Sequence, residues 1–577
     1  MKAARAPRPI KESTFLDDPS LYPEYANLVA QLPTLHAFRR GFHAHRTSAL
    51  LLLLAVCMAV SGVRVPPVDG SATTKDWLDY AFCAMGVDRF VDHFQGMWSA
   101  FAAMAVVASI TVLVYPLHAL TARISTPAAA AGGTAGRPFG TFVVAVGLPS
   151  AAVWGFAVWA QTRCVWALGP GLWFGLFCAC VTLKITAFVA AASVAAAAAA
   201  ATAGEGEGRE EDANGAVPLS LTFGEYLFFV FLSPSLVCEM HLMKVSARRP
   251  SRYGRAASEF FHAGLTFLCA HCLVGSLLAP SLRLFVSGLC PGWVEGAGAG
   301  WAALEAAGGA GWPSWAAGSA LLEGGEDADK GESFGPVVTV GCFLWLLLPV
   351  CSTVHFLVFY AFWHCVCLGM AELWGFPDRN LYGCWWLLFD EPRDFLRMWS
   401  VPVHRWLSAC VHWPMLELTR DTTTTTTTGP PPPPPPPTTT AVSRARWLPA
   451  VLATFLVSGV FHEAVVYLAM RGTCWPFNTF LLCVAGLLIT TWDLVFPPLH
   501  FRAAGDGDPP GSGGGGGGSA VSGQGGQGGG SGHAKAVKAY GDRGKASVFF
   551  FSVLIQLSAF IADTAAWLWW RHVHMRA

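Results

Sequence analysis

Long apolar runs separated by polar loops dominate the pattern of the chain. A helix needs about 20 apolar residues to cross a bilayer, and nine segments come near or exceed this length: 47–63, 97–116, 139–160, 171–202, 257–279, 337–373, 447–470, 476–498 and 547–570. A further apolar run, 223–240, contains Pro234 and therefore predicts a partial or re-entrant helix. The pattern predicts an all-α polytopic membrane protein with about nine transmembrane helices.

Composition supports this class and excludes others. Of 577 residues, 53% are hydrophobic and 13% are charged, whereas soluble domains carry about a quarter charged residues. The net charge of zero gives no reason to expect a nucleic-acid partner. The 17 cysteines show no recurrent spacing, so they indicate neither a disulfide framework nor a zinc site. We expect no metal site.

Loop charges predict the orientation, because cytosolic loops are rich in Lys and Arg. Segment 1–46 and loop 244–255 are basic, and loop 291–333 is acidic. We therefore expect the first two in the cytosol and the third in the lumen. Alternation then places loops 374–446 and 499–546 in the cytosol and the C-terminus in the lumen.

The chain divides into a cytosolic N-terminal segment, 1–46, and a membrane domain, 47–577. Segment 1–46 is polar, so the first apolar run is expected to act as an uncleaved anchor. The membrane domain contains low-complexity inserts that are solvated and carry no chemistry, at 204–215, 422–440 and 511–532.

His462 is the principal candidate for chemistry. It lies within the apolar run Trp447 to Met470, and an ionisable side chain at bilayer depth usually serves a function. Histidine titrates near neutral pH and is a natural general base. The alternative is a structural histidine bonded to a carbonyl, which we favour for His355 and His364. Glu463 points about 100° away from His462 on a helix, so we expect it to pair elsewhere, and we expect Lys184 to snorkel or to mark a helix end.

The second candidate region is the loop that runs from Phe376 to Leu416. It is dense in Trp and Tyr, which alternate with Arg and Asp. Aromatic rings with a polar tip favour the headgroup zone. One interpretation is an interfacial amphipathic helix. The other is the lining of a site for a ligand with a charged head and an oily tail.

The two regions together resemble the membrane-bound O-acyltransferase (MBOAT) family, in the branch of sterol O-acyltransferases and type-1 diacylglycerol O-acyltransferases. The loop sequence LYGCWWL resembles the FYxDWWN block of that branch, and VSGVFHEAVVY resembles its VSAxxHE segment. Weaker matches are FHAHRTS, EYLFFVFLSPSLVCE, AFWHCVCLGMAEL and WLWWRH. The chain departs from the block at Leu381, Cys384 and Leu387.

The resemblance implies roles for individual residues. His462 takes the place of the catalytic histidine, and Ser400 takes the place of a second polar residue, an asparagine in the family. A serine offers one shorter donor where an amide offers two. The substrate-binding positions implied around the acyl-CoA motif are Tyr382, Trp385, Trp386, Arg397 and His404.

The resemblance also implies a fold and an activity. The fold is a helical MBOAT membrane domain around a central catalytic tunnel. The activity is acyl transfer from acyl-CoA, a co-substrate with no further cofactor, to a membrane-dissolved lipid alcohol. FHAHRTS, Arg397 and WLWWRH favour a sterol acceptor, whereas VPVHRW favours diacylglycerol, and we favour the sterol. The resemblance further implies that membrane lipids are partners, that the protein forms a homo-oligomer, and that it is a multi-pass protein of the endoplasmic reticulum membrane.

The chemistry follows from the residue types. A neutral histidine can remove the hydroxyl proton as oxygen attacks the thioester, and Ser400 can donate to the developing oxyanion. Candidate partners for the CoA phosphates, with plain surface charge as the alternative, are Arg379, Arg393, Arg397 and Arg405.

Two other functions remain open. A transporter or channel would be expected to show internal repeats or several charged residues within helices, and neither is visible in the sequence. A catalytically silent relative that binds lipid or protein would fit the departures at Leu381, Cys384, Leu387 and Ser400.

Overall fold

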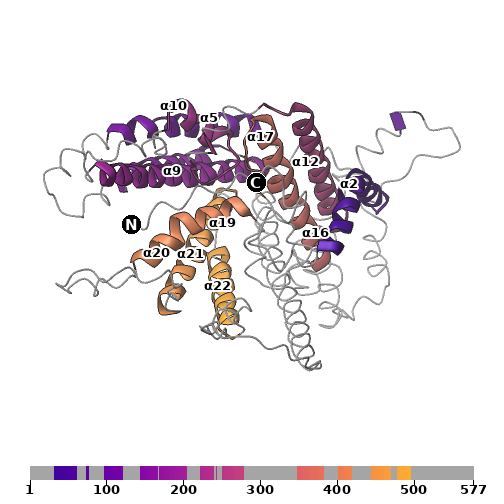
Figure 1. Cartoon of the computed structure of the whole chain (residues 1–577). Coiled ribbons are helices and arrows are strands. Elements are labelled where there is room, and N and C mark those ends of the chain that lie inside the picture. Colours follow the sequence, from indigo (N-terminus) through magenta and orange to yellow (C-terminus); the bar gives the residue numbers. More distant parts are fainter. Residues whose placement is uncertain are drawn as a thin grey trace, which may run out of the picture.

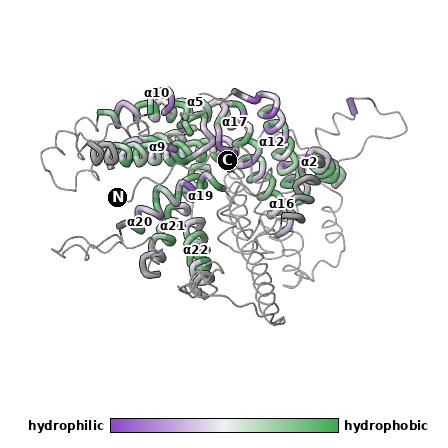
Figure 2. Tube along the Cα trace, in the orientation of Figure 1, coloured by the Kyte–Doolittle hydropathy of each residue, from purple (hydrophilic) through white to green (hydrophobic). Residues whose placement is uncertain are grey.

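The computed structural model describes residues 32–60, 73, 75–76, 96–120, 143–164, 166, 168–203, 221–239, 242–243, 250–278, 347–381, 400–418, 444–469 and 477–495. Within these ranges every regular element is a helix and no strand occurs. Figure 2 shows that apolar residues prevail along most of these helices. The protein is therefore an all-α polytopic membrane protein, as the apolar pattern predicts.

Figure 1 shows how the helices are arranged. The α-helices are α2 (Leu32–Val60), α5 (Met97–Val112), α8 (Leu148–Arg163), α9 (Leu168–Ala203), α10 (Phe223–Leu227), α12 (Tyr253–Leu273), α16 (Leu348–Phe359), α17 (Cys367–Leu373), α19 (Val401–Leu407), α20 (Trp413–Leu418), α21 (Arg444–Ala469) and α22 (Phe477–Val495). Short π-helical segments extend or join them: η3 (Val143–Gly147), η5 (Phe228–Leu232), η6 (Val274–Leu278), η9 (Tyr360–Val366) and η10 (Ser408–His412).

Five helices in the described ranges are long and apolar enough to cross a membrane: Met97–Leu120, Val144–Arg163, Gly169–Ala195, Pro349–Leu373 and Trp447–Ala469. Each falls on a predicted span. Shorter apolar helices, His45–Ala59 and Leu482–Thr491, fall on two more. The span predicted at 257–279 coincides with α12 and η6. The span predicted at 547–570 lies outside the described residues, so the total of nine stays a prediction.

The long helix α9 forms the centre of the described core and packs against α5, α8 and α21 (Figure 1). Its contact with α21 is close because the facing residues are small. A Cβ at Gly171 would lie 3.2 Å from the backbone of Ala469, and one at Gly175 would lie 3.1 Å from the backbone of Val465. In lipid, close backbone approach of this kind replaces the hydrophobic effect as the source of helix association.

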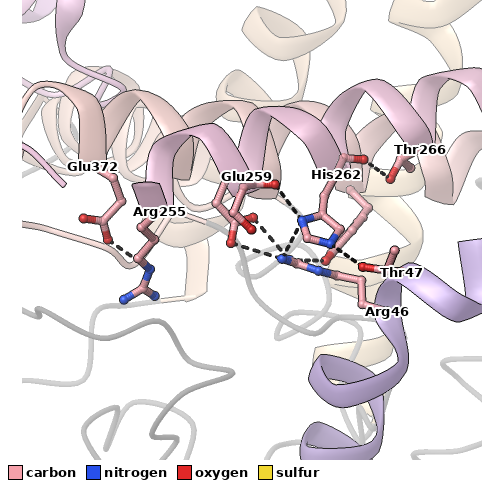
Figure 3. A network of polar contacts seen from close by, with 9 residues as sticks. Arg46, Thr47, Arg255, Glu259, His262, Thr266 and Glu372 are labelled. Carbon is pink, nitrogen blue, oxygen red and sulfur yellow. Dashed lines mark hydrogen bonds and ion pairs between the residues drawn. The ribbon is translucent and has the colours of Figure 1, made fainter. Parts of the chain in front are cut away.

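A second group of helices is held together by a buried polar network (Figure 3). Arg46 of α2 donates to Glu259 of α12 at 3.2 and 3.3 Å, and to the Tyr360 hydroxyl of η9 at 3.1 Å. Thr47 Oγ1 lies 2.9 Å from Nε2 of His262. The network therefore ties the first apolar helix to α12 and η9, far apart in the sequence.

The predicted break at Pro234 is confirmed, because η5 ends at Leu232 and no helix continues through the proline. A helix that ends inside the protein leaves carbonyl groups without partners. Lys184 of α9 supplies the donors: its Nζ lies 2.8 Å from the carbonyl oxygen of Phe229, 3.0 Å from that of Val230 and 2.6 Å from that of Ser233. The prediction that Lys184 snorkels or marks a helix end is wrong, since acceptors inside the protein satisfy its ammonium.

Replacing this lysine by a methionine of similar length is expected to lower the thermal stability of the protein. In Lys184→Met three buried carbonyls lose their donor, and each buried acceptor left unsatisfied costs about 1–3 kcal/mol. The measurement is the melting temperature in detergent, followed by fluorescence-detected size exclusion. Lys75→Met, at an exposed position, is the matched control. Equal melting of the two variants would contradict this role for Lys184.

The chain turns sharply after α17, and this turn leads into the candidate site. Gly375 has φ of 64°, a left-handed conformation that glycine adopts without strain. The Phe376 N–H donates to the Ala371 carbonyl at 2.8 Å, which is the long hydrogen bond of a Schellman motif. Phe376 is fully buried in the core. The turn therefore sends residues 376–381 back into the protein.

Candidate active site

Helix α21 places His462 on an exposed face, with its protonation site fixed by the backbone. Nδ1 lies 2.7 Å from the carbonyl oxygen of Ser458, one turn earlier. A carbonyl oxygen can only accept, so Nδ1 donates to it, and in the neutral imidazole Nε2 then keeps the lone pair. Within the described part of the chain, Nε2 of His462 has no hydrogen-bond partner. This is the state that a general base requires.

His262 has the same local arrangement with a different outcome. Its Nδ1 lies 2.6 Å from the carbonyl oxygen of Ser258, again one turn earlier. Its Nε2, however, is taken by Thr47 Oγ1 at 2.9 Å, and its Nδ1 also lies 2.9 Å from an Arg46 nitrogen. His262 is thus a structural histidine, whereas His462 keeps one nitrogen available for a substrate.

His355 of α16 lies near enough to His462 for the two imidazoles to interact electrostatically. Its ring stacks on Phe359 with 4.5 Å between ring centroids. The sequence favours a structural role for His355 and gives no sign of this proximity, because the two helices come from distant parts of the chain.

The turn of α21 that carries His462 rests on the start of α22. A Cβ at Gly459 would lie 2.7 Å from Cα of Thr479, so the two helices touch at their backbones. The carboxylate of Glu463 accepts from the Thr479 N–H at 3.3 Å. Thr479 is in the first turn of α22, where amides lack helical partners. The prediction that Glu463 pairs with another polar group is confirmed.

Ser400 stands immediately before α19, in an extended conformation with φ −146° and ψ 95°. It is 6% exposed. Its hydroxyl oxygen caps no helix amide and has no hydrogen-bond partner among the described residues. No described contact joins Ser400 to His462, so their joint action on a substrate stays a prediction.

Trp406 connects the helix of Ser400 with the helix of His462. Its Nε1 donates to the Leu183 carbonyl of α9 at 2.7 Å. Its ring meets the ring of Phe461 edge to face, with centroids 6.0 Å apart. Since Phe461 directly precedes His462, α19 and α21 are neighbours at this point, and η10 also packs on α21.

Two of the four candidate phosphate-binding arginines are held in internal ion pairs. Arg379 donates to Glu372 at 3.0 and 3.2 Å, and Arg405 donates to Asp378 at 2.6 Å. Glu372 is fully buried and also faces Arg255 at 3.3 Å (Figure 3). These pairs hold the loop 376–381 against α17 and α19 and join α17 to α12. Arg393 and Arg397 lie outside the described residues.

Of the remaining predicted site residues, the structure describes His404 and leaves four outside the described ranges. His404 is partly buried in the first turns of α19, and its backbone N–H donates to the Ser400 backbone carbonyl at 2.9 Å. Tyr382, Trp385, Trp386 and Arg397 lie outside the described residues. The described part of the chain contains no cluster of three or more His, Cys, Asp or Glu residues that could hold a metal ion.

Comparison with known proteins gives partial matches to lipid acyltransferases. The chain is 33% identical over 141 residues to sterol O-acyltransferase 1 of Saccharomyces uvarum, which covers 23% of this chain and 18% of the relative. It is 29% identical over 136 residues to diacylglycerol O-acyltransferase 1 of Arabidopsis thaliana (23% and 21% covered). It is 32% identical over 130 residues to sterol O-acyltransferase 2 of Homo sapiens (22% and 20%).

These matches are similar to one another in extent. The chain matches about a fifth of the length of these curated relatives. No family model matches the chain. The matches therefore support a relationship to O-acyltransferases and leave the acceptor undecided, because sterol and diacylglycerol enzymes match about equally well.

Proposed function

We propose that this chain is an acyl-CoA-dependent O-acyltransferase that esterifies a lipid alcohol dissolved in the membrane. The observation that carries the proposal is the state of His462, an exposed histidine on an apolar helix whose Nδ1–H is bonded and whose Nε2 is available. The names of the partial relatives support the reaction class.

The reaction can be written around this nitrogen. Nε2 of His462 accepts the proton of the lipid hydroxyl as its oxygen attacks the thioester carbonyl. The tetrahedral intermediate carries an oxyanion, to which the unpaired Ser400 hydroxyl donates. When the intermediate collapses, the carbon–sulfur bond breaks and the thiolate takes the proton from the imidazolium. The products are an ester and free CoA, and the histidine returns to its first state.

The apolar surroundings favour this reaction over hydrolysis. Val460 and Leu456, on other faces of the same helix, are about half exposed, as lipid-facing residues are. Apolar surroundings within a membrane exclude water, which would otherwise compete with the alcohol. The proposal includes a tunnel open to lipid, acyl-CoA entering from the cytosol, residence in the endoplasmic reticulum membrane and a homo-oligomeric state.

We favour a sterol as the acceptor, with diacylglycerol as the alternative. The test uses microsomes from a host that makes no neutral lipid, supplied with labelled oleoyl-CoA and equal amounts of sterol and diacylglycerol. Labelled steryl ester is the expected product. Labelled triacylglycerol without steryl ester would overturn the choice of acceptor and keep the reaction class.

A further inference from the structure

The loop 376–381 and the start of α19 contain buried polar atoms that have no partner. Asn380 is 1% exposed, and within the described part of the chain neither its Nδ2 nor its Oδ1 makes a hydrogen bond. The same holds for Nη1 of Arg379 and Oγ of Ser400, whose residues are 5% and 6% exposed. Unsatisfied buried groups of this kind are rare in proteins and ask for an explanation.

The loop cannot relax to satisfy these atoms, because it is held on every side. Arg379 is fixed to Glu372 by two hydrogen bonds, and Asp378 is fixed to Arg405 of α19. Asp378 also accepts the backbone N–H of Asn380 at 2.9 Å. The Schellman turn fixes the start of the loop. Asn380 is therefore pre-oriented in a rigid loop, as ligand-binding groups are.

The ion pair between Asp378 and Arg405 also relates Asn380 to Ser400. Asn380 lies two residues after Asp378, and Ser400 lies immediately before α19, five residues before Arg405. The ion pair thus joins the loop that contains Asn380 to the helix that Ser400 precedes.

The chemistry of these atoms selects a ligand. A carboxamide with a free donor and a free acceptor is complementary to another amide, whose carbonyl accepts and whose N–H donates. A phosphate offers only acceptors and would leave Oδ1 of Asn380 unpaired. In acyl-CoA the amides belong to the pantetheine arm, which begins at the thioester sulfur. We infer that Asn380 binds an amide of the pantetheine arm, assisted by the free Nη1 donor of Arg379.

This inference rests on the proposed function and makes Asn380 a substrate-binding residue. The test is Asn380→Leu, which keeps the size of the side chain and removes both polar atoms. We expect the KM for oleoyl-CoA to rise about 10- to 100-fold, as expected for losing hydrogen bonds to a substrate, with kcat nearly unchanged. The melting temperature of the free protein should not fall, because the removed atoms have no partner in it.

The matched control is Gln161→Leu, which removes another buried amide with an unpartnered oxygen, on α8. It should leave the KM for oleoyl-CoA unchanged. A second arm compares two shorter substrates. One is oleoyl-pantetheine, and the other is the oleoyl thioester of a simple alkanethiol, which has no amide. The wild type should prefer oleoyl-pantetheine to this thioester, and Asn380→Leu should lose the preference.

A binding readout separates failure of this inference from failure of the proposed function. Oleoyl-CoA should raise the melting temperature of the wild type, and this rise should shrink in Asn380→Leu and in the isosteric Asn380→Asp. Suppose that the protein forms no ester while the oleoyl-CoA-induced rise in melting temperature is smaller in the two Asn380 variants than in the wild type. That result would contradict the proposed function and support the inference. Unchanged KM values and unchanged ligand-induced melting shifts in both variants would overturn it.

Discussion

Replacing His462 by alanine is expected to lower kcat for acyl transfer by about 10²–10⁴-fold, the usual contribution of a general base. The variant loses the imidazole whose Nδ1 is bonded to the Ser458 carbonyl and whose Nε2 is available to the substrate. His462→Gln should be similarly impaired, because an amide cannot take up the hydroxyl proton. The measurement is the initial rate of ester formation with saturating oleoyl-CoA and acceptor.

The control for this experiment is His45→Ala, an exposed histidine on α2. It should retain the wild-type rate. Both variants must elute and melt like the wild type, so that a lost rate reports on chemistry. A His462→Ala protein that is folded and fully active would show that this histidine is only structural.

Replacing Arg46 by methionine is expected to lower the free energy of unfolding by about 3–5 kcal/mol, the usual cost of leaving one partner of a buried ion pair alone. Glu259 is 7% exposed and would keep its charge without the guanidinium. The Tyr360 hydroxyl would lose the same partner. The measurement is the denaturation midpoint in detergent, with the change in melting temperature as a second readout.

The double variant Arg46→Met with Glu259→Met supplies the control. Removing both members of a buried pair is much less costly than removing one, so the second change should restore part of the stability. If the single Arg46 variant melts like the wild type, the network of Figure 3 does not hold α2 in place.

The sequence predicts those features of the fold that depend on neighbouring residues. Apolar length locates five of the spans in the described residues, and Pro234 locates the broken helix. The sequence cannot predict the partners of Lys184 and Arg46, because these come from distant segments. The carbonyls on Lys184 follow it by 45 to 49 residues, and the partners of Arg46 lie 213 to 314 residues away.

The sequence likewise predicts some features of the candidate site and not others. His462 can be found from sequence, since an ionisable residue is rare within an apolar run. Its tautomer depends on the helix that brings the Ser458 carbonyl to Nδ1. The internal pairing of Arg379 and Arg405 depends on the turn at Gly375, which reverses the chain. No sequence pattern indicates that the buried amide of Asn380 lacks a partner in this loop.

The most direct test of the central claim is ester formation by the purified full-length protein in lipid nanodiscs. The protein would receive oleoyl-CoA with a sterol or with diacylglycerol, and mass spectrometry would follow both the ester and the free CoA. We predict equal amounts of ester and CoA from the wild type, and neither from His462→Ala. Folded wild-type protein that binds oleoyl-CoA yet forms no ester with either alcohol would contradict the account and indicate a lipid-binding relative without catalysis.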